Sequence, residues 1–286
     1  MPADRAVQRR RSHVGLNVCA NTTGEVSAPS RILLHSCCAP CSGAMFLDFL
    51  GRGLDVTVIF YNPNIHPREE YDIRKEENKR FCAKHGVPFV DCDYDATAWF
   101  ARTKGQELEP ERGARCTSCF DMRMEVTAAY ADAHGFDVFT TTNATSRWKD
   151  LAQVNGAGFR AAQAYPNLRY WAGDWQGDDM TRKKYEVSAH ERFYKQEYCG
   201  CSYSLRDSNL FRESKGLAPC VIGGDAAGLG TRYFENPTED AEEESQNVVD
   251  SFFAAADRDF DSERLKTRKM YADRVKNEGL GKANNW

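Results

Sequence analysis

Short apolar runs and amphipathic helical segments alternate from residue 31 onward in this 286-residue chain, and this alternation restricts the possible folds more than any other feature. Apolar runs over 31–36, 56–61 and 88–92 have the length and character of buried strands. The segments 43–50 and 69–85, which lie between them, have the apolar spacing of helices. Strands that alternate with helices in this way predict a parallel α/β sheet.

The remainder of the chain is expected to contain further segments of both kinds. They are a polar connection over 94–115, a helix over 116–134, a strand over 136–142, a helix over 150–165, an aromatic loop over 170–177 and a helix over 184–198. Residues 1–30 are rich in arginine and poor in acidic residues, which predicts either a disordered tail or an organelle transit peptide. We therefore expect a folded domain over 31–220, followed by an acidic, partly helical extension over 221–286.

The overall composition excludes several classes of protein. Hydrophobic residues make up 41% and charged residues 28% of the chain, which are ordinary values for a globular protein. No run approaches the roughly 18 apolar residues that a membrane-spanning helix needs. The net charge of −4 argues against non-specific coating of nucleic acid but permits a local basic groove.

Seven of the eleven cysteines fall into three tight groups. The groups are Cys37-Cys38-x-x-Cys41, Cys116-x-x-Cys119 and Cys199-x-Cys201. The odd total and the lack of a secretory signal argue against a disulfide scaffold, so the groups indicate metal binding or redox chemistry. The first group directly follows the first expected strand, at the edge of a parallel sheet where ligands usually bind. Thiolates are typical ligands of iron–sulfur clusters and of zinc, and each of these centres takes four ligands. Seven clustered cysteines are therefore more than one such centre needs.

Four motifs occur in order along the chain: HSCCAPCS at 35–42, FYNPNIHP at 60–67, RCTSCF at 115–120 and YCGCSYS at 198–204. Together they resemble the QueH family of epoxyqueuosine reductases, from about residue 31 to residue 210. The resemblance implies a Rossmann-like parallel sheet of the ATP-pyrophosphatase (HUP) type with helical additions, without the use of ATP. It also implies an oxidoreductase that removes the epoxide oxygen of epoxyqueuosine at the wobble position of tRNA, in a two-electron reduction that gives queuosine.

The same resemblance implies cofactors and partners. The cofactors are a [4Fe–4S] cluster and an additional mononuclear iron. The partners are an epoxyqueuosine-modified tRNA with a GUN anticodon and an external electron donor, with no membrane involved. The expected location is the cytoplasm, or an organelle if residues 1–30 are a transit peptide. Two alternatives stay open: another iron–sulfur or zinc tRNA-modifying enzyme, of the thiolation type, and a non-catalytic metal-binding protein.

The seven cysteines can be divided between the two implied centres. Adjacent side chains on a backbone point in different directions, so Cys37 and Cys38 are expected to serve different centres. We assign Cys37, Cys116, Cys119 and Cys199 to the cluster, and Cys38, Cys41 and Cys201 to the mononuclear iron. Exchanging Cys37 with Cys38, or Cys199 with Cys201, would fit the same argument.

Epoxide reduction and tRNA binding need further side chains. A proton donor must help the oxygen to leave, and the candidates are His66, Tyr71 and Asp121. A basic rim for tRNA is expected to include Arg74, Arg115, Arg123, Lys149 and Arg182. The aromatic residues that could stack on unpaired bases are Trp148, Tyr170, Trp171 and Trp175. The expected loop position of Trp171 favours stacking, and the alternative is that these rings belong to the core.

Overall fold

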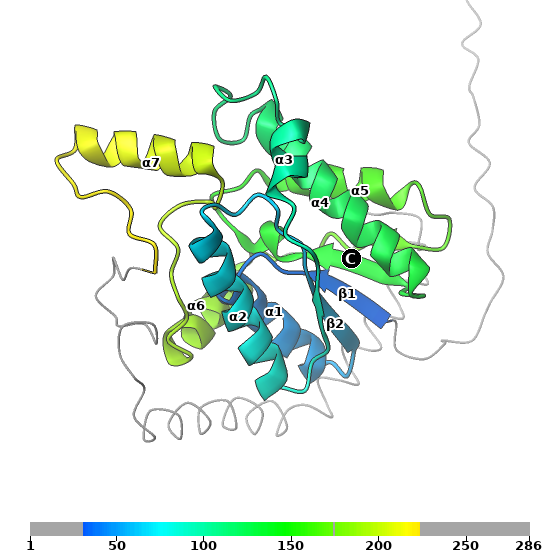
Figure 1. Ribbon diagram of the computed structural model, residues 1–286. Coiled ribbons are helices and arrows are strands. Elements are labelled where there is room, and N and C mark those ends of the chain that lie inside the picture. The colour runs from blue at the N-terminus through cyan, green and yellow to red at the C-terminus, as the bar shows by residue number, and fades with distance from the viewer. Residues whose placement is uncertain (1–30, 174, 224–286) are drawn as a thin grey trace, which may run out of the picture.

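The computed structural model describes residues 31–173 and 175–223, and its centre is a five-stranded, all-parallel sheet (Figure 1). The strands are β1 (Arg31–His35), β2 (Asp55–Phe60), β3 (Phe89–Asp91), β4 (Val138–Thr141) and β5 (Arg169–Tyr170), in the order β3-β2-β1-β4-β5. The predicted parallel α/β class is therefore confirmed. The expected segments within 1–30 and 224–286 lie outside the described residues.

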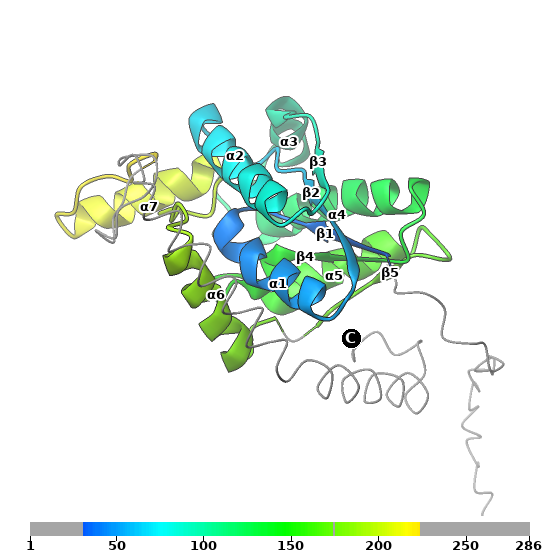
Figure 2. The same ribbon diagram turned by 90° about the horizontal axis from the view of Figure 1, so that it is seen from below.

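Helices cover both faces of the sheet (Figures 1 and 2). The helices of the described ranges are α1 (Ala39–Gly51), α2 (Arg68–Lys84), α3 (Ala96–Arg102), α4 (Ala114–Ala133), η1 (Thr142–Thr145), α5 (Leu151–Ala162), α6 (Asp178–His190) and α7 (Ser202–Ser214). Helix α1 packs against α2 and α6, whereas α4 packs against α5 on the other face. Because both faces are covered, the central strand β1 is an unbroken apolar run, with Ile32, Leu33 and Leu34 all buried.

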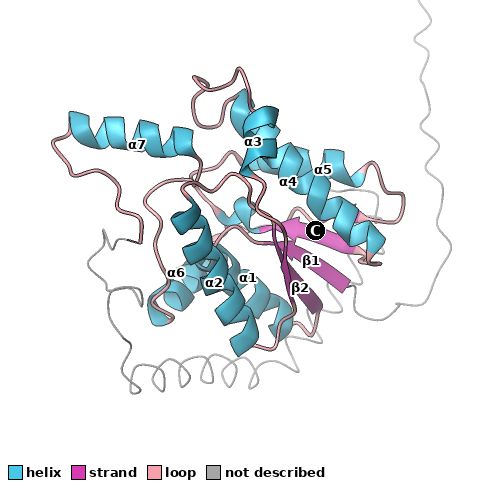
Figure 3. Ribbon diagram, in the orientation of Figure 1, coloured by secondary structure: helices cyan, strands magenta, loops and turns pink. Residues whose placement is uncertain are grey.

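Several predicted boundaries were wrong. Helix α1 begins at Ala39 instead of residue 43, because Pro40 lies in its first turn, where the missing N–H costs nothing. The expected polar connection over 94–115 contains α3, whose first turn is capped by the Asp95 carboxylate. The final expected helix, 184–198, is shifted to Asp178–His190, with two acidic residues in its first turn. The colouring of Figure 3 shows these elements.

Strand β5 and helix α7 were not predicted either. Strand β5 has only two residues, too few for a periodic pattern, and it occupies the start of the expected aromatic loop. Helix α7 follows the last cysteine motif, with Cys201 as its N-cap residue. Within the described ranges, no helix combines the length and the apolar character that crossing a bilayer requires.

His35 ties three neighbouring strands together at the carboxyl edge of the sheet. Its Nδ1 lies 2.9 Å from the Thr141 hydroxyl, and its Nε2 lies 3.0 Å from the Tyr61 carbonyl oxygen. Complete burial, assisted by the Arg123 charge, lowers the pKa of His35 to about 3, so the ring is neutral at ordinary pH. The first cysteine group follows this fixed point directly.

Candidate metal centre

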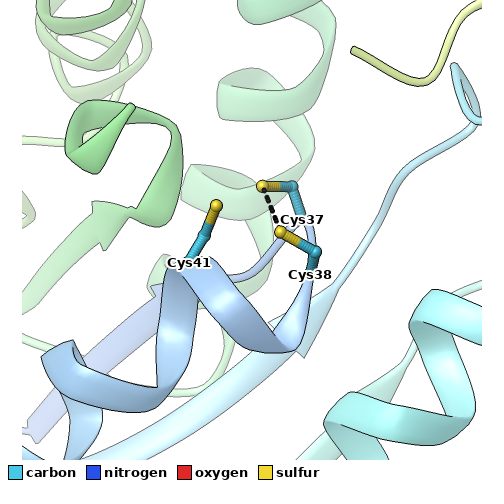
Figure 4. Close-up of side chains that lie close together, drawn as sticks. All are labelled: Cys37, Cys38 and Cys41. Atoms are coloured by element: carbon cyan, nitrogen blue, oxygen red, sulfur yellow. Dashed lines mark hydrogen bonds between the residues drawn. The ribbon is translucent and has the colours of Figure 1, made fainter. Parts of the chain in front are cut away.

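Three thiols converge where β1 passes into α1. The sulfur atoms of Cys37, Cys38 and Cys41 all lie within 4.8 Å of one another, and those of Cys37 and Cys38 are 3.8 Å apart (Figure 4). Cys38 is the N-cap residue of α1, and Cys41 lies in its first turn, so both reach the same end of the helix. The expectation that Cys37 and Cys38 point apart was wrong, because the chain turns from strand to helix at these residues.

The spacing of these three thiols fits a single tetrahedral ion. With a metal–sulfur distance of about 2.3 Å, two corners of a tetrahedron lie about 3.8 Å apart. The Cys37–Cys38 separation has this value, and the third thiol lies within 4.8 Å of both. Three protein ligands would leave a fourth position open, which is the arrangement of catalytic rather than structural metal sites.

Electrostatics single out Cys37 as the group that ionises first. Hydrogen bonds from the Cys38 and Cys41 thiols lower the pKa of Cys37, and the charges of Arg123 and Lys149 act in the same direction. The same hydrogen bonds raise the pKa of Cys38, and the contact with Cys37 raises that of Cys41 to about 12. Cys37 is therefore the most acidic of the three thiols, and a bound metal would displace the protons that the thiols hold.

The other four clustered cysteines form a second group. Cys116 and Cys119 lie on the first turns of α4, and Cys119 and Cys201 pack in one apolar cluster with Trp99. Burial and then the charge of Cys199 raise the pKa of Cys116 to about 11 and that of Cys201 to about 12. The structure thus brings Cys37 together with Cys38 and Cys41 rather than with Cys116, Cys119 and Cys199, and it places Cys201 beside Cys119.

Arg74 holds the loop that carries Cys199 and Cys201. Its Nε and Nη2 donate to the Glu70 carboxylate, at 2.8 and 2.6 Å, within α2. Its Nη1 donates to the Cys199 carbonyl oxygen at 3.0 Å, and Nη2 also reaches the Tyr198 carbonyl oxygen. Both Arg74 and Glu70 are fully buried, so the pair fixes the backbone beside the thiols.

His66 fixes the same loop from the other side. Its backbone N–H donates to the Gly200 carbonyl oxygen at 2.8 Å, and its Nδ1 accepts from the Ser202 N–H at 3.3 Å. Burial lowers the pKa of His66 to about 4, so the ring is neutral. These contacts give His66 a structural role, and they do not support its predicted role as a proton donor.

The other two proton-donor candidates also lie away from the pocket. Tyr71 is buried against Phe60 and Tyr94, and burial raises its pKa. Asp121 pairs with Arg160 at 2.6 Å, on the side of α4 that faces α5. Neither residue lines the pocket described next.

A small pocket lies beside the three thiols and extends to Cys199. It is lined by Cys37, Cys41, Asn64, Ile65, Arg74, Arg123, Asn143, Ser146, Lys149, Gln196 and Cys199. The Arg123 guanidinium donates to the side-chain oxygens of Asn62 and Asn143, at 2.9 and 3.2 Å. The Lys149 Nζ lies 3.2 Å from the Cys199 sulfur. Sequence reasoning overlooked the asparagines, although Asn62 and Asn64 stand inside the FYNPNIHP motif.

The expected basic rim is largely a buried wall instead. Arg74, Arg115 and Arg123 are each at most 2% exposed, and Lys149 points inward to Cys199. Each of two arginines has a partner within the protein: Arg74 pairs with the buried Glu70 carboxylate, and Arg115 lies over the half-buried Tyr203 ring. Arg182 is exposed, as expected, but its guanidinium pairs with Asp179 and Glu186 on α6.

Three of the four aromatic residues proposed for base stacking are in the core. Trp171 stacks on Phe49 at 5.1 Å and meets Trp175 edge-on at 4.8 Å. Tyr170 is the last residue of β5 and packs against Phe139. The predicted role of Trp171 does not fit this buried position, because β5 continues the sheet where a loop was expected.

Replacing Trp171 with alanine is therefore expected to lower stability rather than RNA affinity. Removing a fully packed indole costs about 3–5 kcal/mol of the free energy of unfolding. The exposed Trp148, replaced in the same way, is expected to cost less than about 0.5 kcal/mol. Urea unfolding of both variants measures the difference, and equal losses would contradict the assignment of Trp171 to the core.

Comparison with known proteins adds independent evidence. Residues 32–207 match the family model described as epoxyqueuosine reductase QueH. A protein of that name from Haemophilus influenzae is 56% identical over 194 residues, which cover 68% of this chain and 79% of that protein. One from Acinetobacter baylyi is 53% identical over 193 residues, covering 68% and 88%. A more distant one, from Staphylococcus epidermidis, is 36% identical, covering 63% of this chain and 78% of that protein.

Proposed function

This chain belongs to the QueH family of epoxyqueuosine reductases, and on that premise we propose that it removes the epoxide oxygen of epoxyqueuosine in tRNA by two-electron reduction. It is an oxidoreductase of queuosine synthesis. The observation that carries the proposal is the cluster of three thiols, two of which, Cys37 and Cys41, line one pocket together with Cys199 from another cysteine motif.

We propose that Cys116, Cys119, Cys199 and Cys201 hold a [4Fe–4S] cluster, and that Cys37, Cys38 and Cys41 hold a mononuclear iron. Four thiolates are the usual ligand set of such a cluster. Buried N–H groups support this assignment, since Arg115 Nε and Nη2 have no hydrogen-bond partner among the described residues. Arg115 is close enough for its charge to lower the pKa of Cys116 and Cys201. Such N–H groups suit the sulfur atoms of an anionic cluster.

The pocket wall supplies the remaining groups. When bound, the cluster would pass electrons one at a time from the external donor, and the mononuclear iron would act as a Lewis acid for the epoxide oxygen. Arg123 donates to the side-chain oxygens of Asn62 and Asn143, and its Nη1 also donates to the Cys119 sulfur at 4.0 Å, so its guanidinium lies beside the cysteines. Lys149 holds protons on Nζ in the pocket wall, where His66, Tyr71 and Asp121 do not reach. Because arginine does not give up a proton in proteins, Lys149 is the proposed proton source. Burial lowers the pKa of Lys149, but the charges of Cys199 and Cys37 outweigh burial and raise it, so its Nζ stays protonated in the pocket wall.

The proposal predicts the metal content of protein purified without oxygen. The expected result is a brown protein with about five irons and about four acid-labile sulfides per chain. Incubation with epoxyqueuosine-modified tRNA and a chemical reductant is then expected to give queuosine, measured by mass spectrometry of the digested RNA. Stoichiometric zinc without sulfide would contradict the assignment, and tRNA-stimulated ATP hydrolysis would favour a thiolation enzyme instead.

A further inference from the structure

Trp148 is exposed at the rim of the pocket, unlike the other aromatic residues considered for RNA binding. It is 68% exposed, whereas Trp171 and Trp175 are buried. It stands in the short segment 146–149 between η1 and α5, and both ends of that segment, Ser146 and Lys149, line the pocket. The backbone therefore carries the indole beside the pocket while leaving it in contact with solvent.

Hydrogen bonds hold this segment from two directions. Arg112 donates from Nε to the Trp148 carbonyl oxygen, at 3.0 Å, and from Nη2 to the Arg147 carbonyl oxygen, at 3.4 Å. Gln176 Nε2 donates to the Ser146 carbonyl oxygen at 3.1 Å. The backbone that presents the indole is thus fixed before any partner arrives, which reduces the entropy lost on binding.

The charges around the ring favour a nucleic acid as its partner. The Arg147 guanidinium lies 4.9 Å from the centroid of the Trp148 ring, and Arg112 and Arg147 are both exposed. The neighbouring Asp150 uses its carboxylate to cap α5, accepting from the N–H groups of Ala152 and Gln153. A flat aromatic ring beside two guanidinium groups offers stacking to a base and ionic contact to its phosphate.

We propose that Trp148 stacks on an unpaired base that flanks the modified nucleotide in the anticodon loop, with Arg112 and Arg147 beside the phosphate backbone. This inference rests on the proposed function, because it takes tRNA as the substrate. It assigns recognition of the loop to the segment 146–149 rather than to the buried arginines.

The test compares RNA stem–loops that carry one abasic nucleotide at each loop position in turn. The loaded, full-length protein is titrated with each RNA, and binding is followed by anisotropy. Trp148→Ala is expected to weaken binding of the intact stem–loop roughly tenfold. The wild type is expected to bind one of the abasic stem–loops about tenfold more weakly than the intact stem–loop. Trp148→Ala is expected to bind that abasic stem–loop and the intact one equally, because the stacking contact is already lost. Trp148→Phe is expected to restore most of the affinity, and Phe211→Ala, at another exposed aromatic, should bind like the wild type.

Failure of the stacking proposal can be distinguished from failure of the proposed function, because conversion of the epoxide by the wild type is measured in the same preparations. If Trp148→Ala binds every stem–loop as tightly as the wild type, or loses the same factor at all positions, stacking by Trp148 is overturned whatever the activity. If the wild type binds with the expected dependence on Trp148 but leaves the epoxide intact, the proposed function fails while the RNA contact stands.

Discussion

Replacing Cys116 with alanine is expected to bleach the protein and to abolish epoxide reduction. Cys116 lies in the first turn of α4 and belongs to the proposed set of four thiolate ligands. A [4Fe–4S] cluster that loses one of its four thiolates is expected not to be retained. The visible absorbance, the sulfide and about four irons per chain should disappear together. Absorbance spectra and metal analysis of the anaerobic protein measure this directly.

Cys41→Ala provides the contrast, because Cys41 belongs to the three-thiol group. This variant is expected to keep the cluster absorbance, to lose about one iron and to lose turnover. Cys41→Asp is expected to retain some activity, since a carboxylate also binds iron. Cys92→Ala, at a half-buried cysteine outside both groups, serves as the control. If Cys41→Ala bleaches the cluster as completely as Cys116→Ala does, the division into two groups is wrong.

The second large effect is expected at Gly200, which separates the proposed ligands Cys199 and Cys201. Its φ is +137°, a conformation that residues with a side chain rarely adopt. A Cβ atom here would also lie 3.1 Å from Arg74 Nη1 and 3.2 Å from Ile65 Cγ1. Gly200→Ala must therefore displace either the cysteine loop or the arginine that holds it. We expect loss of iron and turnover, and a strain of about 1–3 kcal/mol.

Gly216→Ala is the matched control for this substitution. Gly216 also has a positive φ, of +67°, but a Cβ atom there would meet nothing within 4 Å. It is expected to cost about 1 kcal/mol and to leave the metal content unchanged. Thermal unfolding and iron analysis of both variants separate backbone strain from crowding. Equal iron content in the two variants would show that crowding of a Cβ atom at position 200 against Arg74 does not affect metal retention.

The sequence was sufficient to predict four of the five strands of the sheet and the set of candidate ligands. Apolar runs and cysteine spacing are local patterns, so β1, β2 and the three cysteine groups could be recognised without knowing what lies opposite them. The pairing of Cys37 with Cys38 was not predictable in this way. It depends on the turn between β1 and α1, where the rule of alternating side chains no longer applies.

Whether a charged or aromatic side chain is buried or exposed depends on partners that are remote in sequence. Arg123 is buried because Asn62 and Asn143, from two other segments, accept its hydrogen bonds. Trp171 is buried because Phe49 of α1 lies beside it. A basic or aromatic residue in the sequence looks the same whether it faces solvent or such a partner. Solvent exposure of these residues therefore required the structure.

The order of the elements also bears on how the protein matures. All five strands end by Tyr170, yet Cys199 and Cys201 follow only after α6. Chains are synthesised from the N-terminus, and domains tend to fold as they emerge. A nascent chain can therefore complete its sheet, with the first five clustered thiols in place, before the last two exist. On the proposed assignment, the three-thiol site is complete early, whereas assembly of the four-thiolate cluster has to wait for Cys199 and Cys201. Until then Cys116 and Cys119 would need protection from oxidation.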